Sequence, residues 1–108
     1  MAISKLDIAR FRREVIFVSM AVDQAEALAL RALAFLAGDD HRFQRFLLST
    51  GATAEDARSR ATEPEFLSGV MDHLLTDEAL LVAFAQDAAL EPSAVAAARW
   101  RLPGAAMD

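Results

Sequence analysis

Apolar residues recur along this chain at spacings of three and four positions, which is the period of an amphipathic helix. No stretch alternates apolar and polar residues in the manner of a half-buried strand. We therefore expect an all-α protein, a compact bundle of six to seven short helices. The stripes predict helices at about 24–37, 40–50, 54–60, 64–75, 77–88 and 92–102, with a weaker amphipathic stretch at 4–18.

Capping residues separate these stripes. Asp23, with Glu26 three positions on, predicts the start of the first helix, and Gly38 predicts its end in the left-handed conformation. The remaining predicted boundaries are a start at Asp39 or Asp40, a stop at Gly51, a capping box of Thr53 and Asp56, starts at Pro64, at Thr76 or Asp77 and at Pro92, and an end at Pro103 and Gly104.

Residues 26–61 and 64–99 match each other in residue class when they are shifted by 38 positions. The apolar stripes fall in register, and the identical pairs are Leu36/Leu74, Asp39/Asp77 and Phe46/Phe84. A period of this length suits a helical unit that cannot bury its apolar face alone. We interpret the chain as two pseudo-repeated three-helix units.

The two copies differ on the faces that point away from the stripe. Ala27, Leu30 and Ala34 correspond to Glu65, Ser68 and Asp72, whereas Arg42, Gln44 and Arg45 correspond to Leu80, Val82 and Ala83. The more apolar helices should be the more buried ones. We therefore predict that helices 24–37 and 77–88 form the centre and that 40–50 and 64–75 lie outside. Residues 6–18, or a partner, should cover the back of the first helix.

A length of 108 residues allows one domain, which we divide into an N-terminal amphipathic segment or extension (1–22), a helical domain (23–104) and a disordered tail (105–108). An alternative start at Met20 would place residues 1–19 outside the native protein. The absence of cysteine excludes disulfides, thiolate metal sites and cysteine nucleophiles, and agrees with a cytoplasmic location. No apolar run approaches the ~20 residues that a membrane span needs.

The distribution of charge argues against nucleic-acid binding. The whole chain carries a formal charge of −5, although its first residues are basic, and an acidic body repels a phosphate backbone. An open alternative is a helix-turn-helix regulator in which residues 54–60, with Arg58 and Arg60, would contact DNA. Glu55 and Asp56 occupy the positions that would meet base edges, so we expect no nucleic-acid partner.

Candidate chemistry is sparse. His41 and His73 lie near carboxylates in the sequence, and His73 stands four positions before Asp77. A metal site needs at least three aligned ligands, so we interpret His73 as a partly buried aromatic residue near a helix end. No nucleophile elbow or phosphate loop is present. We expect no enzyme activity, catalytic residue, metal or cofactor, while a ligand- or metal-binding pocket or enzyme using His73, Asp72 and Asp77 remains the alternative.

Arg99 and Arg101 bracket the single tryptophan, Trp100. Trp100 is either an aromatic anchor that packs the last helix onto the bundle, the interpretation we favour, or part of an interaction surface, where Trp and Arg are enriched. The surplus of apolar surface predicts a non-catalytic protein that binds another protein or its own copy. The candidate interaction surface comprises Phe11, Leu30, Arg99, Trp100 and Arg101.

Four segments resemble an alphaproteobacterial family of unknown function, DUF3572. They are AEALALRALAFLAGD, RFLLSTG, PEFLSGVMDHLLTDEALLVAFA and PSAVAAARWRLPG, and the resemblance covers about residues 23–104. Family members begin near the position of Met20, so the segment before it departs from the pattern. The resemblance implies a bacterial, cytoplasmic, helical protein and assigns no activity or ligand.

Overall fold

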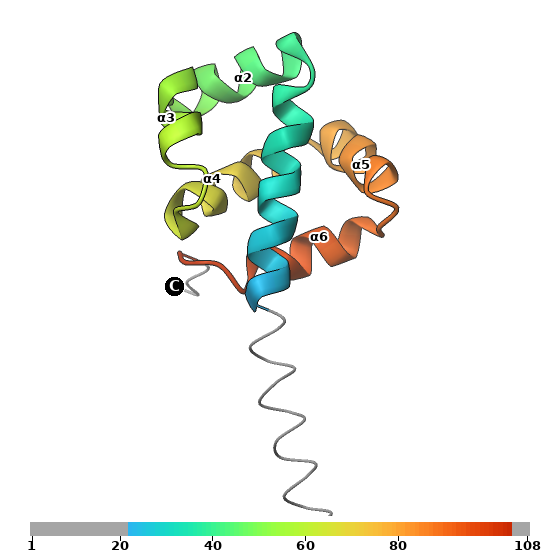
Figure 1. Cartoon of the computed structure of the whole chain (residues 1–108). Helices are drawn as coiled ribbons and strands as arrows, with labels where there is room; N and C mark the ends of the chain where they lie inside the picture. Colours follow the sequence, from blue (N-terminus) through green and yellow to red (C-terminus); the bar gives the residue numbers. More distant parts are fainter. Residues whose placement is uncertain (1–21, 105–108) are drawn as a thin grey trace, which may run out of the picture.

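The computed structural model describes residues 22–104, and every regular element within that range is a helix (Figure 1). The first described helix covers residues 22–37. It is followed by α2 (Asp40–Thr50), α3 (Ala54–Ser59), α4 (Pro64–Leu75), α5 (Glu78–Asp87) and α6 (Pro92–Arg99). The prediction of an all-α bundle of short helices is confirmed.

Side-chain caps begin three helices at the positions that the sequence predicts. The carboxylates of Asp39 and Asp77 each accept a hydrogen bond from the backbone N–H three residues on, at 2.9 and 3.1 Å. Thr53 and Asp56 form a reciprocal capping box at the start of α3. The helices α4 and α6 each begin with a proline in the first turn, where its missing N–H costs nothing.

The ends of the first helix differ from the prediction. Residue 22 is already helical, so Asp23 is not its cap. Gly38 does not adopt a positive φ, and its N–H donates to the carbonyl oxygen of Ala34 at 3.0 Å, as in the helix before it. The chain turns at Asp39 instead (φ −136°), because the cap of α2 requires extended backbone there.

A spacing of 38 residues recurs in the backbone as well as in the sequence. Helices end at residues 37 and 75 and begin at 40 and 78 and at 54 and 92. The aligned residues Leu36 and Leu74 are both fully buried, as are Phe46 and Phe84. These helix bounds and two buried pairs follow the predicted spacing of 38 residues, while the repeat itself stays a prediction. That the two units superpose stays a prediction.

The central helix is α4, which the sequence places outside. It packs against α2, α5 and α6. The outer-face residue Ser68 is only 5% exposed, whereas its counterpart Leu30 is 43% exposed, so the predicted arrangement is wrong. Ser68 can be buried because its hydroxyl lies 3.0 Å from the carbonyl oxygen of Pro64 and donates to that of Pro103 at 2.7 Å. Burying a polar group costs little free energy when the group is hydrogen-bonded.

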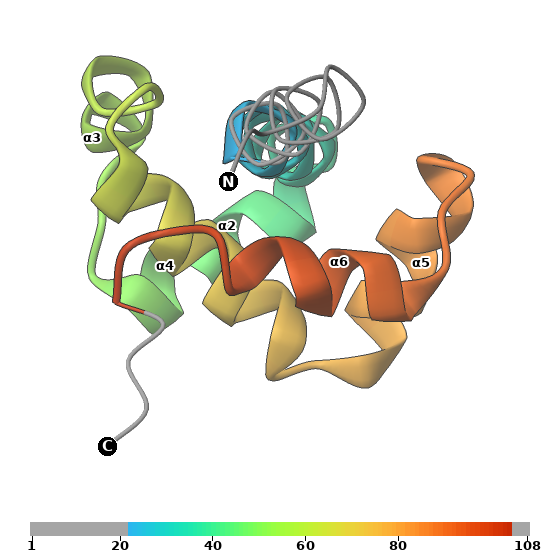
Figure 2. The same cartoon turned by 90° about the horizontal axis from the view of Figure 1, so that it is seen from below.

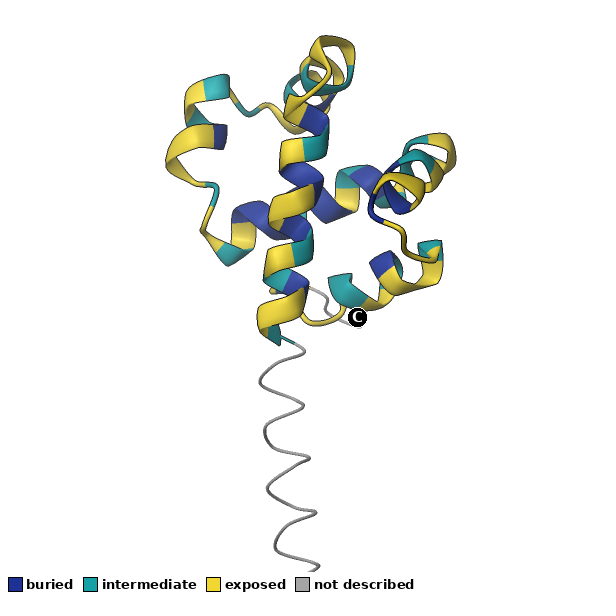
Figure 3. Ribbon diagram, turned by 45° about the vertical axis from the view of Figure 1, so that its right-hand side comes forward, coloured by how far each residue is buried: buried dark blue, intermediate teal, exposed yellow. Residues whose placement is uncertain are grey.

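The 22–37 helix lies across one side of the molecule. Figure 2 looks along this helix and shows α4 and α6 on one side of it, with α3 and α5 at its flanks. Ala29 and Leu36, on the inner face, are fully buried, whereas Ala27, Leu30 and Ala34 are exposed (Figure 3). Within residues 22–104 this helix is buried on one face only, contrary to the prediction. The expected cover by residues 6–18 lies outside the described residues.

The helix α5 is less central than the sequence indicates. Leu80 and Ala83 are half-buried and Val82 is exposed, so the prediction that this face lies in the centre of the bundle is wrong. The buried contacts come from the opposite face, where the rings of Phe84 and Phe35 pack at 5.4 Å. The helix α2 lies outside as predicted, with a single buried residue.

Candidate functional site

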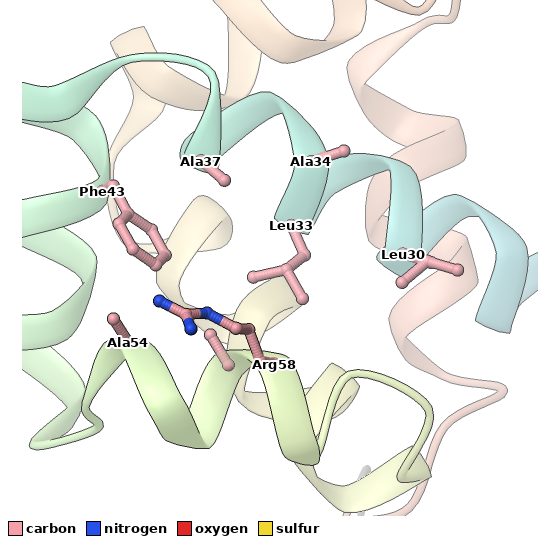
Figure 4. Close-up of a pocket in the computed structure, with 8 residues that line it drawn as sticks. Leu30, Leu33, Ala34, Ala37, Phe43, Ala54 and Arg58 are labelled. Atoms are coloured by element: carbon pink, nitrogen blue, oxygen red, sulfur yellow. The ribbon is translucent and has the colours of Figure 1, made fainter.

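An apolar groove separates the 22–37 helix from α3. Its volume is about 360 Å³, and its lining residues are Leu30, Leu33, Ala34, Ala37, Phe43, Ala54, Ala57 and Arg58. Figure 4 shows Arg58 extending from α3 toward the side of the groove that Phe43 forms. Leu30 also borders a second hollow of about 250 Å³ with Ala61 and Leu67. We call the larger of these the α3 groove.

A second groove lies on the other side of the same helix, beside α6. Its volume is about 480 Å³, and its lining residues are Gln24, Ala25, Ala27, Leu28, Arg31, Leu90, Ala94, Ala97, Ala98 and Arg101. Seven of the ten lining residues are apolar, and the two charged residues are both arginines. We call it the α6 groove. The exposed face of the 22–37 helix therefore has an apolar groove on each side.

Trp100 does not anchor the last helix. Its side chain is 61% exposed, so the favoured interpretation of an aromatic anchor is wrong. Of the other predicted surface residues, Leu30 lines the α3 groove and Arg101 lines the α6 groove. Phe11 lies outside the described residues.

Arg99 is the anchor instead. Its side chain is only 13% exposed and pairs with Asp72 through Nε at 2.6 Å and Nη2 at 3.2 Å. Its Nη1 donates to the carbonyl oxygens of Leu102 and Pro103, at 3.3 and 3.0 Å. A planar guanidinium can bind a carboxylate with two groups while a third serves the backbone, which indole cannot do. Arg99 therefore holds the end of the described chain against α4. Its guanidinium stabilises the fold and is largely buried.

His73 occupies the place predicted for it, at a half-buried position near the end of α4. Its Nδ1 lies 2.9 Å from the hydroxyl of Ser49, and its ring packs edge-on against Phe46. Burial lowers the pKa of His73 below its ordinary value, a lowering that the Asp77 carboxylate opposes and the Arg45 guanidinium reinforces. The imidazole is therefore mostly neutral at pH 7.

The carboxylates near His73 in the sequence have other partners in the fold. Asp72 pairs with Arg99, and Asp77 caps α5 and lies 3.6 Å from Arg45. His41 is exposed in the first turn of α2. No three histidine or carboxylate side chains of residues 22–104 come together in a group that could hold a metal ion.

The arginines that the DNA-binding alternative relies on are paired with nearby carboxylates. Arg58 lies 3.7 Å from Glu55, and Arg60 donates to Glu63 at 2.8 Å. The helix α3 is only six residues long and has Glu55 and Asp56 in its first turn. A helix of this length with acidic N-terminal positions is poorly suited to enter a major groove.

The sequence reasoning missed the α6 groove, including Arg31 and Leu90. The available signal was the apolar position Leu28 beside Arg31 on the first helix, together with the alanines of the last helix. That signal does not say that these two segments, more than sixty positions apart, lie side by side. The pairing is a product of the tertiary fold.

The helices of residues 22–104 include none that is by itself long and apolar enough to cross a membrane. Taken together, α5 and α6 have sufficient length and apolar character, but they meet at a bend of 104°.

The chain matches no curated protein and no solved structure. Residues 22–105 match the family described as "Protein of unknown function (DUF3572)". This range coincides with the described helices and with the segments on which the resemblance rests. The chain is a member of the DUF3572 family.

Proposed function

We propose that this chain is a non-catalytic interaction module of the bacterial cytoplasm, and that the exposed face of its 22–37 helix binds a helix of another protein. The observation that carries the proposal is the exposure of Leu30 between the apolar α3 groove and the smaller hollow, which Asp23 and Glu26 also line. An apolar face flanked by grooves is the geometry that receives an amphipathic helix in helix-in-groove recognition.

Several carboxylates and a serine hydroxyl support a non-catalytic role, because they form hydrogen bonds within the fold. The carboxylates of Asp39, Asp56 and Asp77 accept backbone hydrogen bonds at helix starts. The hydroxyl of Ser49 is engaged by His73 and by a backbone carbonyl oxygen. Neither apolar groove contains a histidine or a carboxylate. An active site needs acid, base or nucleophilic groups that converge on a pocket.

The test is photo-crosslinking in the cell from which the chain comes. A photoreactive amino acid at position 30 should give one discrete adduct of constant mass with another protein. The matched control is position 48, because Leu48 is 82% exposed on α2 and lines neither groove. Position 48 should give no such adduct.

Two results would overturn the proposal. One is the absence of a discrete adduct at position 30, or an equal adduct at position 48. The other is an adduct between two copies of this chain, which light scattering of the purified protein would detect independently as a dimer. Leu30→Asp should abolish the adduct formed by a photoreactive group at position 34, and Leu48→Asp should not.

A further inference from the structure

The arginines of residues 22–104 divide into two groups according to their partners. Five contact another side chain of the described fold: Arg42 over the ring of Phe35, Arg45 with Asp77, Arg58 with Glu55, Arg60 with Glu63 and Arg99 with Asp72. Arg31 and Arg101 have no carboxylate of residues 22–104 within 4.0 Å. Both of them are exposed and line the α6 groove.

The coincidence of these two arginines with one groove is informative because the chain is acidic. Carboxylates outnumber basic side chains by sixteen to eleven, so partners for an arginine are abundant. Arg31 and Arg101 have no carboxylate partner in the described fold, and both border the α6 groove. Together they give this apolar surface a positively charged rim. A partner that binds there gains from complementary negative charge.

The shape and lining of the groove favour a helix as the occupant. One wall is the 22–37 helix, and the other is formed by α6 with the residues that flank it, Leu90 and Arg101. Figure 1 shows α6 passing beside the N-terminal half of the 22–37 helix. Ala27, Ala94 and Ala97 provide small exposed positions that let another backbone approach closely. The groove is open to solvent, and a small ligand there would leave much of its surface in water.

We infer that the α6 groove binds an acidic amphipathic helix of a partner protein, with apolar side chains against the alanines and Leu90 and with carboxylates on Arg31 and Arg101. The inference rests on the proposed function and names the chemistry of the partner. A segment of this chain is a poorer occupant, because residues 1–19 carry four basic side chains against two acidic ones and would place like charges together.

The arginines act mainly by charge. An exposed guanidinium contributes to the association rate and to the choice of partner, in a manner that salt weakens. Arginine can also bind a carboxylate with two parallel hydrogen bonds, which lysine cannot do. Replacing each arginine by lysine should therefore weaken binding less than reversing its charge.

The experiment is a selection on the full chain from a library of helical peptides. Each peptide of the library carries apolar residues at the i, i+3, i+4 and i+7 positions of a helix, and its other positions are random choices among Glu, Lys and Gln. Enriched peptides should be acidic, and their affinity should fall steeply with added salt. The double variant Arg31→Glu with Arg101→Glu should weaken binding about tenfold or more. The matched control is Arg45→Glu, which reverses an exposed arginine of α2 that lines neither groove and should change the affinity less than about twofold.

Circular dichroism shows whether the variants fold, and the single variant Arg101→Gln replaces the double one if that unfolds. Enrichment of neutral or basic peptides, no enrichment at all, or an equal loss in Arg45→Glu would overturn the inference. A failure here is distinguishable from a failure of the proposed function. If position 30 still gives its adduct in the Arg31→Glu/Arg101→Glu protein while selection shows no acidic preference, the interaction role stands and the assignment of the α6 groove fails.

Discussion

Gly51 and Ala89 adopt the same left-handed backbone conformation at equivalent positions, 38 residues apart. Gly51 has φ 76° at the end of α2, and Ala89 has φ 58° just after α5. The N–H of Leu90 donates to the carbonyl oxygen of Ala85 and that of Ala89 to Gln86, which together form a Schellman motif. Glycine is the usual residue at such a position, because a Cβ in the left-handed region is strained. Alanine occupies it at position 89.

Ala89→Gly should stabilise the protein by about 1 kcal/mol, because it relieves the strain of the left-handed alanine. Gly51→Ala should destabilise it by a similar amount, and the cause would be the backbone, since a Cβ at Gly51 meets no atom within 4 Å. Urea unfolding of the two variants measures both changes. Equal or lower stability of Ala89→Gly would contradict this account of the turn.

Arg99→Ala should cost about 1.5–3 kcal/mol of stability, because it removes a charge-assisted pair with Asp72 and the hydrogen bonds to the carbonyl oxygens of Leu102 and Pro103. The carbonyl oxygen of Pro103 keeps the Ser68 hydroxyl as a donor. Trp100→Ala should change stability by less than about 0.5 kcal/mol, because the indole is exposed. Chemical denaturation of the two variants measures their free energies of unfolding and shows which side chain stabilises the fold. A larger loss in Trp100→Ala would restore the aromatic-anchor interpretation.

The stability of the protein should fall as the pH drops through the range in which His73 titrates. Because burial lowers the folded pKa below the ordinary value of 6.5, the neutral ring favours folding. This contribution is fully present above the unfolded pKa and is lost as the pH falls through the folded pKa. Unfolding at about pH 7.5 and about pH 5.5 measures it.

His73→Gln should reduce that pH dependence while keeping a polar partner for Ser49. Asp39 and Asp56 contribute at lower pH, because backbone hydrogen bonds lower their pKa values below 3.8. An unchanged slope between the two pH values in His73→Gln would show that another group titrates there.

Ser68 and Leu30 are aligned in the predicted repeat but differ in environment. Ser68→Leu should destabilise the protein by about 1–3 kcal/mol, because a larger side chain enters a filled space and the hydrogen bond to Pro103 is lost. Leu30→Ser should have a much smaller effect, since Leu30 is 43% exposed and Ser68 only 5%. Thermal unfolding of both variants tests the order, and a greater loss in Leu30→Ser would restore the predicted central position of the first helix.

The boundaries that the sequence predicts correctly are those set by local chemistry. The capping carboxylate of Asp39, the capping box of Thr53 with Asp56, and Pro64 at a helix start depend on residues within one helical turn. The left-handed stop predicted at Gly38 is absent. The next helix begins so soon after Gly38 that the extended backbone of its cap, Asp39, makes the turn instead. Of the residues predicted for an interaction surface, Leu30 and Arg101 border grooves, Arg99 pairs with Asp72 and Trp100 is exposed. That they form an interaction surface stays a prediction.

The sequence by itself determined the helical class, most of the helix bounds and the apolar stripes that face the core, because periodicity and capping act over a few neighbouring residues. The tertiary structure alone decided which helix occupies the centre. Hydrophobic contrast between the two units placed α4 outside, but a hydroxyl with a carbonyl partner, as at Ser68, can be buried as readily as an apolar group. Whether such a partner exists depends on a segment more than thirty residues away, and the sequence pattern does not contain that information.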